Sequence, residues 1–255
     1  MMLNHNKPTN IFNLNFMFFK SKRLLMKTRR MMYGFRIFIP GLREIHKLES
    51  LVGPLGYWSK LQKYQINLLK TFGLQPEHSL LDVGCGPLQG GIAFISYLNR
   101  NNYTGIELSH HSLSVAYSQI VKHNLCHKNP TLLQSSTFGR DELSHKFFNY
   151  IWVSQLMYHL DEYRMIEIFK LMNDILKPGG VLLFDILSTD HYEFKYHEHK
   201  HHLHTPELTK KIAALYGLSS EVKGKIVEYG YPKQLSLHTN YLMCVRKSVQ
   251  AISNY

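Results

Sequence analysis

The sequence has little cysteine: its 255 residues include only Cys85, Cys126 and Cys244, far apart and with no Cys-x-x-Cys pair. Such a set argues against a disulfide framework and favours a reducing compartment. A long apolar run is also missing, because the stretch 11–19 ends at Lys20 and a membrane span needs about 20 residues. We therefore expect a cytoplasmic protein with no transmembrane segment.

Acidic residues are absent from positions 1–43, which hold nine lysines and arginines; the first acid is Glu44. The rest of the chain carries 21 bases against 18 acids, so the formal charge of +12 comes mostly from this leader. The nearly balanced body gives no sign of a polyanionic substrate. We predict a basic N-terminal extension over residues 1–50, partly disordered or helical.

Three interpretations of the leader stay open. An acid-free basic segment is typical of an organelle-targeting peptide, although Ser21 is its only serine. Residues 1–43 could instead contact an anionic membrane surface peripherally. The third interpretation is an extension without a function of its own, with Met26 or Met31 as the working start.

Residues 51–248 alternate short apolar runs with amphipathic stretches. The pattern predicts strands at 80–83, 103–108, 131–134, 150–154 and 181–187, and weaker strands near 226–228 and 241–245. Helices are expected at 58–72, 90–98, 113–121, 161–175 and 206–216. This alternation is typical of an α/β, doubly wound, mostly parallel seven-stranded sheet with helices on both faces. An N-terminal helical extension would precede it.

The run Leu-Leu-Asp-Val-Gly-Cys-Gly at 80–86 ends the first predicted strand in glycines. In a doubly wound sheet, ligands bind outside the carboxyl ends of the strands, so this loop is the expected nucleotide-type cofactor site. Gly84 and Gly86 permit a tight turn and close approach of the backbone to a ligand. Asp82 could orient the loop, or a cofactor ammonium through a water.

Glu107 strengthens this weak signal, because it ends the second predicted strand 23 residues after Gly84. A carboxylate there can accept hydrogen bonds from both ribose hydroxyls; the alternative is that it only caps the following helix. A dinucleotide fingerprint has glycine at its sixth position, which is Gln89 here, with Gly90 one residue late. The spacing therefore disfavours a nicotinamide cofactor.

Four segments in order resemble the motifs of class I, Rossmann-like S-adenosylmethionine-dependent methyltransferases: LLDVGCG, YTGIELS, NYIWVSQLMYHL and LKPGG. The resemblance runs from about Trp58 to Leu187 and more loosely to Val245. It implies a class I methyltransferase domain over residues 51–248, with S-adenosyl-L-methionine as cofactor. In a related subgroup an arginine often stands where Gln89 does.

The resemblance also implies cofactor contacts. Gly84, Cys85 and Gly86 would contact the methionine part, Glu107 the ribose, and Ser136 would replace the family's usual acid beside the adenine amino group. The full expected set is Asp82, Gly84, Cys85, Gly86, Glu107, Leu108, Ser136, Ser154 and Gln155. The family usually has aspartate where Asn149 opens the fourth strand.

Methyl transfer mainly requires that the enzyme align the acceptor with a methyl group that the cofactor has already activated. The expected catalytic residues follow the fourth strand, which faces the methyl group in this family: Tyr158 and His159, beside Gln155. A histidine suits a general base because it titrates near working pH. A packing role for His159 is an equal alternative.

Residues 191–204 hold six of the sixteen histidines: His191, His197, His199, His201, His202 and His204. A metal site is one interpretation, but no cysteine or tightly spaced aspartate accompanies them, so we predict no metal. In this fold a variable connection covers the active site here, and we favour a substrate lid.

The sequence thus predicts a methyltransferase with a small-molecule acceptor. Three alternatives stay open: an RNA methyltransferase that uses the basic N-terminus, a non-catalytic cofactor-binding member of the fold, and a nicotinamide oxidoreductase. The first would show steep salt dependence of RNA binding.

Overall fold

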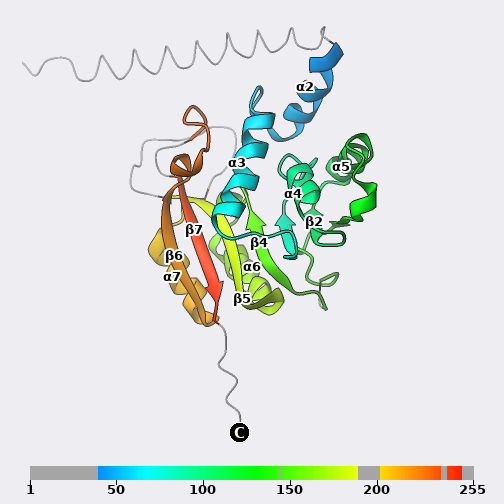
Figure 1. The fold of residues 1–255 in the computed structure, drawn as a ribbon. Coiled ribbons are helices and arrows are strands. Elements are labelled where there is room, and N and C mark those ends of the chain that lie inside the picture. The colour runs from blue at the N-terminus through cyan, green and yellow to red at the C-terminus, as the bar shows by residue number, and fades with distance from the viewer. Residues whose placement is uncertain (1–39, 144, 189–201, 237–239, 249–255) are drawn as a thin grey trace, which may run out of the picture. The chain divides into compact units, whose positions relative to one another are not determined.

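The computed structural model describes residues 40–143, 145–188, 202–236 and 240–248 (Figure 1). The chain divides into two units, Met1–Gly56 and Tyr57–Tyr255. In the first, the described part contains the helix α2, Pro40–Val52; residues 1–39 of the predicted basic extension lie outside the described residues. The domain limits that we drew, 1–50 and 51–248, stay a prediction.

The second unit is built on a seven-stranded sheet, as the sequence predicts, in the order β3-β2-β1-β4-β5-β7-β6. Strands β1 to β5 are parallel, and β7 is antiparallel to both β5 and β6. The strands are β1 Leu80–Val83, β2 Tyr103–Glu107, β3 Thr131–Gln134, β4 Phe148–Val153, β5 Leu176–Leu187, β6 Leu218–Lys225 and β7 Asn240–Lys247. The strand order reverses between β1 and β4, which is where ligands bind in such sheets.

Helices cover both faces of this sheet, and in Figure 1 α3 crosses the near face while α6 lies behind β4 and β5. One hydrophobic cluster joins the sheet to α3, α4 and α5, and a second joins it to α6 and α7. The helices are α3 Trp58–Thr71, α4 Gly91–Tyr97, α5 His110–Lys122, α6 Glu162–Ile175 and α7 Pro206–Leu215.

Local sequence signals explain where several of these helices begin. Asp161, which we expected to cap α6, accepts a hydrogen bond from the Arg164 backbone N–H at 2.8 Å. Thr205 caps α7 in the same way, accepting from the Leu208 N–H at 3.1 Å, and Pro206 follows as the first helical residue. Each cap satisfies an N–H that has no partner within its helix.

One strand prediction is wrong: residues 226–228 form part of a 3-10 helix, η4 (Ile226–Tyr229), and the strand is β6, which ends at Lys225. Among the described residues, β6 is an edge strand that pairs only with β7. Its sequence LSSEVKGK is polar because few of its side chains are buried. The apolar Ile226 does not mark a strand; it is fully buried in the core beneath η4.

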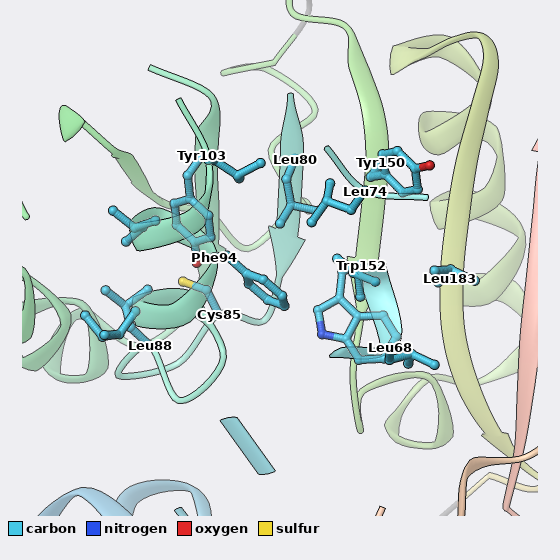
Figure 2. Packing of buried hydrophobic residues seen from close by; sticks show 14 of the residues in the cluster. Leu68, Leu74, Leu80, Cys85, Leu88, Phe94, Tyr103, Tyr150, Trp152 and Leu183 are labelled. Carbon is cyan, nitrogen blue, oxygen red and sulfur yellow. The ribbon is translucent and has the colours of Figure 1, made fainter. Parts of the chain in front are cut away.

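The core on the α3 face holds the largest buried side chains, among them Trp152, Phe94 and Tyr103 (Figure 2). The Trp152 indole donates to Gln65 Oε1 of α3 at 2.9 Å, so the helix is tied to β4 by a buried hydrogen bond. Gly90 comes so close that a Cβ there would overlap Gln65 Oε1. A larger residue at the start of α4 would therefore have to displace the Gln65 side chain.

Candidate functional site

The glycine-rich loop follows β1 at the point where the strand order reverses. Gly84 has φ +75° and is exposed, and a Cβ there would lie 3.4 Å from Leu156 Cδ2, just after β4. The backbone N–H groups of Gly84 and Cys85 both donate to the Ile106 carbonyl of β2, at 2.8 and 3.0 Å. The loop is thus fixed to β2 on one side and touches the segment after β4 on the other.

Glu107 ends β2 and joins two loops through its carboxylate. Oε2 accepts from the Gly86 N–H at 3.0 Å, and Oε1 accepts from the Ser109 N–H at 2.9 Å. Ser109, rather than Glu107, is the side-chain cap of α5, accepting from the Ser112 N–H at 3.2 Å. Glu107 is therefore not the side-chain cap of the following helix. It is half-buried beside the glycine loop, and each of its carboxylate oxygens has a second lone pair that can accept a further hydrogen bond.

Asp82 and Cys85 both lie in the core beneath the loop. Asp82 is 4% exposed and accepts from the Tyr103 hydroxyl at 2.8 Å. Burial raises the pKa of Asp82 to about 7, although that hydrogen bond lowers it. Cys85 Sγ would lie 2.8 Å from a Cβ at Gly105, and Figure 2 shows the sulfur among core side chains. A ligand in the loop would therefore meet Cys85 through its backbone.

The ends of β2 and β3 offer exposed surface. Leu108 is 65% exposed, which is unusual for a leucine that directly follows a buried strand, and its carbonyl accepts from Gln134 Nε2 at 3.2 Å. Ser136 is exposed two residues after β3. The turn there is organised by Ser135 instead, whose hydroxyl accepts from the Gly139 N–H at 2.9 Å.

Asn149 lies at the other end of the sheet, at the start of β4. Its Oδ1 accepts from the Ser79 N–H at 3.0 Å, from the Ser79 hydroxyl at 2.9 Å and from Lys177 Nζ at 3.0 Å. The neutral amide thus joins the starts of β1, β4 and β5. Asparagine in place of the usual aspartate affects this structural junction, which is remote from the glycine loop.

The segment after β4 contains a polar network centred on Gln155. Its backbone N–H donates to Asp185 Oδ1 at 2.7 Å, and its Nε2 donates to Asp185 Oδ2 at 2.6 Å. Gln155 Oε1 accepts from the Tyr158 hydroxyl at 3.0 Å and from the Tyr231 hydroxyl at 3.2 Å. Asn240 of β7, with its amide nitrogen turned toward β5, donates to Asp185 Oδ2 at 3.2 Å. Five residues from four segments are therefore linked.

Burial shapes the electrostatics of this network. It raises the pKa of Asp185 to about 7, against the lowering effect of the hydrogen bonds from Gln155 and Asn240. It also raises the pKa of both Tyr158 and Tyr231 well above the ordinary value, and the Asp185 charge adds to the effect. Both phenols consequently keep their hydrogens at neutral pH and cannot serve as phenolate bases.

The sequence pointed to Gln155 and Tyr158 but missed Asp185, Tyr231 and Asn240. The available signal was Asp185, the one charged residue in the apolar run 181–187. An unpaired charge is rarely buried in a strand, so its presence there indicates a polar site at the strand end.

His159 ends the 3-10 helix η3 (Met157–His159) and is exposed. Its ring lies 4.6 Å from that of Tyr158, measured between centroids. Ser154, also predicted to contact the cofactor, is half-buried directly after β4. The structure thus brings Ser154, Gln155, Tyr158 and His159 into one short segment beside the glycine loop.

The histidine-rich segment is described only at its end, because residues 191, 197, 199 and 201 lie outside the described residues. The His202 N–H donates to the Tyr158 carbonyl at 2.7 Å. His204 is 3% exposed, and its Nε2 lies 2.9 Å from the Leu160 carbonyl and 3.2 Å from that of Met157. His204 is therefore a core residue that fixes the turn after β4.

Two searches of the described residues gave negative results. Within residues 40–143, 145–188, 202–236 and 240–248, no group of three His, Cys, Asp or Glu side chains could hold a metal ion. Over the same part of the chain, no helix has the length and apolar character needed to cross a membrane.

Comparison with known proteins adds to this geometry. Residues 57–230 match a family model described as a methyltransferase domain. A protein of Geobacillus sp. (strain WCH70), provisionally named a methyltransferase, is 32% identical over 133 residues, which are 50% of this chain and 50% of that protein. The match therefore spans half the length of that relative.

Solved structures share the fold. An S-adenosylmethionine-dependent methyltransferase from Clostridium acetobutylicum ATCC 824 is 16% identical with a TM-score of 0.60, over 81% of this chain and 98% of that one. The magnesium protoporphyrin IX methyltransferase ChlM from Synechocystis PCC 6803, solved with bound SAM, is 12% identical with a TM-score of 0.55, over 86% and 96%. At such identities the likeness establishes the fold and leaves the acceptor unassigned.

Proposed function

The chain belongs to the family of methyltransferase domains, and on this basis we propose that it transfers a methyl group from S-adenosylmethionine to a small-molecule acceptor. The resemblance to class I methyltransferases seen in the sequence is confirmed by the family match and the fold, and the cofactor is confirmed at the level of that family. What we propose is that this chain binds S-adenosylmethionine and that the acceptor is a small molecule.

The observation that carries the proposal is the position of Glu107 beside the glycine loop. A carboxylate tied to the Gly86 N–H at 3.0 Å, at the end of β2, is placed to accept the two hydroxyls of a ribose. Leu108 next to it is 65% exposed, and its apolar side chain offers a surface on which an adenine ring packs. Gly84 lies at the surface with a backbone conformation that leaves room for the methionine part. These three residues therefore fit an adenosyl group with an attached methionine part.

The remaining predicted contacts keep their roles as proposals. Asp82 orients the loop from below through the core, Cys85 and Gly86 supply backbone, and Ser136 can accept a hydrogen bond from the adenine amino group without adding charge. Ser154 and Gln155 lie at the methionine end, after β4. Bound S-adenosylmethionine supplies an electrophilic methyl group on a sulfonium.

Tyr158 and His159 are the proposed catalytic residues. The acceptor's lone pair bonds to the methyl carbon while the carbon–sulfur bond breaks, its electron pair going to sulfur. The acceptor's proton then leaves to the exposed His159 imidazole or to water. Tyr158 keeps its hydrogen and acts by holding the acceptor in line.

A small-molecule acceptor is favoured by the charge distribution, since the chain after residue 43 is nearly balanced. A glycopeptide N-methyltransferase, MtfA, shares the fold at a TM-score of 0.57 and 14% identity, so the fold accommodates such an acceptor. Location in the cytoplasm stays part of the proposal.

Calorimetry with S-adenosylmethionine, S-adenosylhomocysteine and NAD tests the proposed cofactor. We expect binding of both adenosyl compounds and none of NAD. Glu107→Ala should weaken S-adenosylmethionine about 10- to 100-fold, as expected for lost hydrogen bonds to a charged group, whereas Glu77→Ala, an exposed glutamate, should not. Absence of heat with both adenosyl compounds would refute the proposal.

The proposed catalytic role of His159 needs a separate measurement. His159→Ala should keep the affinity for S-adenosylmethionine. It should lower the rate at which tritiated methyl groups are transferred to the best acceptor from a panel of amines, phenols and carboxylic acids.

A further inference from the structure

Asp185 holds Gln155 at two points. Its two carboxylate oxygens accept hydrogen bonds from the backbone N–H of Gln155, at 2.7 Å, and from the side-chain Nε2 of Gln155, at 2.6 Å. Gln155 has φ +55°, a left-handed conformation that residues other than glycine adopt rarely and that concentrates at functional sites. The carboxylate is 1% exposed at the end of β5. The backbone and the amide of Gln155 are thus both fixed by one rigid strand.

When Asp185 is ionised, above its pKa of about 7, this arrangement fixes the direction of the hydrogens of Gln155 and of both phenols. Nε2 of Gln155 faces the carboxylate, so Oε1 faces away from it. Oε1 accepts hydrogen bonds from the hydroxyls of Tyr158 and Tyr231, with oxygen–oxygen distances of 3.0 and 3.2 Å. Each phenol has one hydrogen. Any further hydrogen bond that either phenol oxygen makes is therefore accepted, not donated.

The network lies beside the glycine loop, where the proposed function places the methyl group. Leu156, next to Gln155, lies close to Gly84 of that loop, because a Cβ added at Gly84 would be 3.4 Å from Leu156 Cδ2. Gln155 and Tyr158 are half-buried, so this side of the network meets the surface. Tyr231 is buried, and its ring packs edge-to-face on Tyr64 of α3 at 5.3 Å between centroids. The network thus runs from Tyr231 in the core to Tyr158 at the boundary between core and solvent.

We propose that the phenol oxygens of Tyr158 and Tyr231 bind the methyl acceptor. Asp185, acting through Gln155, orients both phenols so that their oxygens accept hydrogen bonds. The site therefore binds a nucleophile with N–H or O–H groups, such as a primary amine, rather than a carboxylate. This inference rests on the proposed methyl transfer. Two hydrogens of a neutral amine donate to the two oxygens, which leaves the nitrogen lone pair free to bond to the methyl carbon. The carbon–sulfur bond breaks toward sulfur, and the new ammonium loses one proton to water. A carboxylate would set its oxygens against phenol lone pairs.

Sinefungin provides the test, because it carries an amine in place of the methylsulfonium and S-adenosylhomocysteine has no group there. For the full-length protein we expect calorimetry to give sinefungin at least about tenfold higher affinity than S-adenosylhomocysteine, since its ammonium forms charge-assisted hydrogen bonds to the phenol oxygens. The quantity that matters is this ratio of affinities. A variant that merely damages the fold lowers both.

Tyr231→Phe, which keeps the ring packed on Tyr64, should lower the ratio several-fold and leave S-adenosylhomocysteine unchanged. Asp185→Asn should also lower the ratio, because the amide NH2 replaces one of the two oxygens that accept hydrogen bonds from Gln155. Gln155→Met retains the Asp185 charge but releases the phenols, and should also lower the ratio. Tyr97→Phe is the matched control, since that hydroxyl bonds the Leu74 carbonyl elsewhere in the fold.

The outcomes separate the two proposals. If neither ligand binds the unmodified protein, the proposed function fails. If both bind equally, or if Tyr231→Phe leaves the ratio unchanged, the proposed function stands and the acceptor site is overturned. If Asp185→Asn lowers the ratio while Gln155→Met does not, the carboxylate acts through its charge alone, and its positioning role is wrong.

Discussion

Asp82 and Asp185 carry carboxyl groups that are buried on the sheet face that α3 covers, near the carboxyl ends of β1 and β5. Each has only neutral hydrogen-bond donors among the contacts described above, and burial raises the pKa of each from 3.8 to about 7. The folded protein therefore holds protons that the unfolded chain releases at lower pH. Local chemistry at these two residues couples proton binding to stability.

The sign of that coupling follows from the raised pKa. The stabilising effect of the protonated form is complete below pH 4 and is lost as pH rises through about 7. Between these values, each group should lower the free energy of unfolding by about 1.4 kcal/mol per pH unit. Denaturant unfolding between pH 5 and pH 7 should show a falling midpoint, and Asp82→Asn should flatten the slope. Asp174→Asn, at an exposed position, is the control; an unchanged slope in the Asp82 variant would contradict the assignment.

At the residue scale, the roles predicted for the site residues stay a prediction, but part of their arrangement in space was predictable from the sequence. Gly84, Gly86 and Glu107 could be expected to lie close together because they stand at the ends of the first two strands of a parallel sheet, and Gly86 and Glu107 are joined by a hydrogen bond at 3.0 Å. Tyr231 and Asn240 could not, because they reach Asp185 from segments far along the sequence whose pairing only the fold decides. Asp185 itself was detectable as a charge within an apolar strand.

At the scale of elements, the contact between α3 and α4 depends on Gly90. Its missing side chain admits Gln65 Oε1, which accepts the Trp152 indole hydrogen at 2.9 Å. The expected consequence is that Gly90→Ala displaces Gln65 and destabilises the protein by about 1–3 kcal/mol, through overpacking and a buried indole N–H without a partner.

A double-mutant cycle measures this effect. In a Gln65→Ala background the alanine at position 90 has space, so the second substitution should add little to the loss caused by the first. Chemical denaturation of the four proteins gives the coupling energy. Additive losses would mean that Gly90 is required for another reason.

Elements with strong periodicity were predictable, and β6 was not. The parallel strands β1 and β4 are buried on both faces, so their apolar runs stand out from the sequence. β6 pairs on one edge only and its side chains are partly solvated, which removes the hydrophobic pattern. Neighbouring Ile226 is apolar for a different reason, because it fills the core under η4.

At the scale of the molecule, charge and fold are separated along the chain. Positions 1–43 carry nine basic residues and no acid, whereas the unit Tyr57–Tyr255 holds the whole sheet and the candidate site. A chain that starts at Pro40 should therefore bind S-adenosylhomocysteine within about twofold of the full-length protein, as expected for a unit with its own core.

The same pair of proteins tests the RNA alternative. If the leader grips phosphates, RNA binding by the full-length protein should weaken steeply with salt and disappear in the shortened one. We expect weak and equal RNA binding by both proteins. Strong, salt-sensitive binding confined to the full-length protein would favour a nucleic-acid acceptor over a small molecule.

The position of β7 between β5 and β6 has a consequence for how the protein is made. β6 is translated before β7, yet β7 is the only strand with which β6 pairs in the described part of the chain. A nascent chain that has just released β6 from the ribosome consequently carries a strand with nothing to pair with, next to an open edge of β5. The sheet grows in chain order no further than β5, and its completion must wait until residues 240–247 emerge.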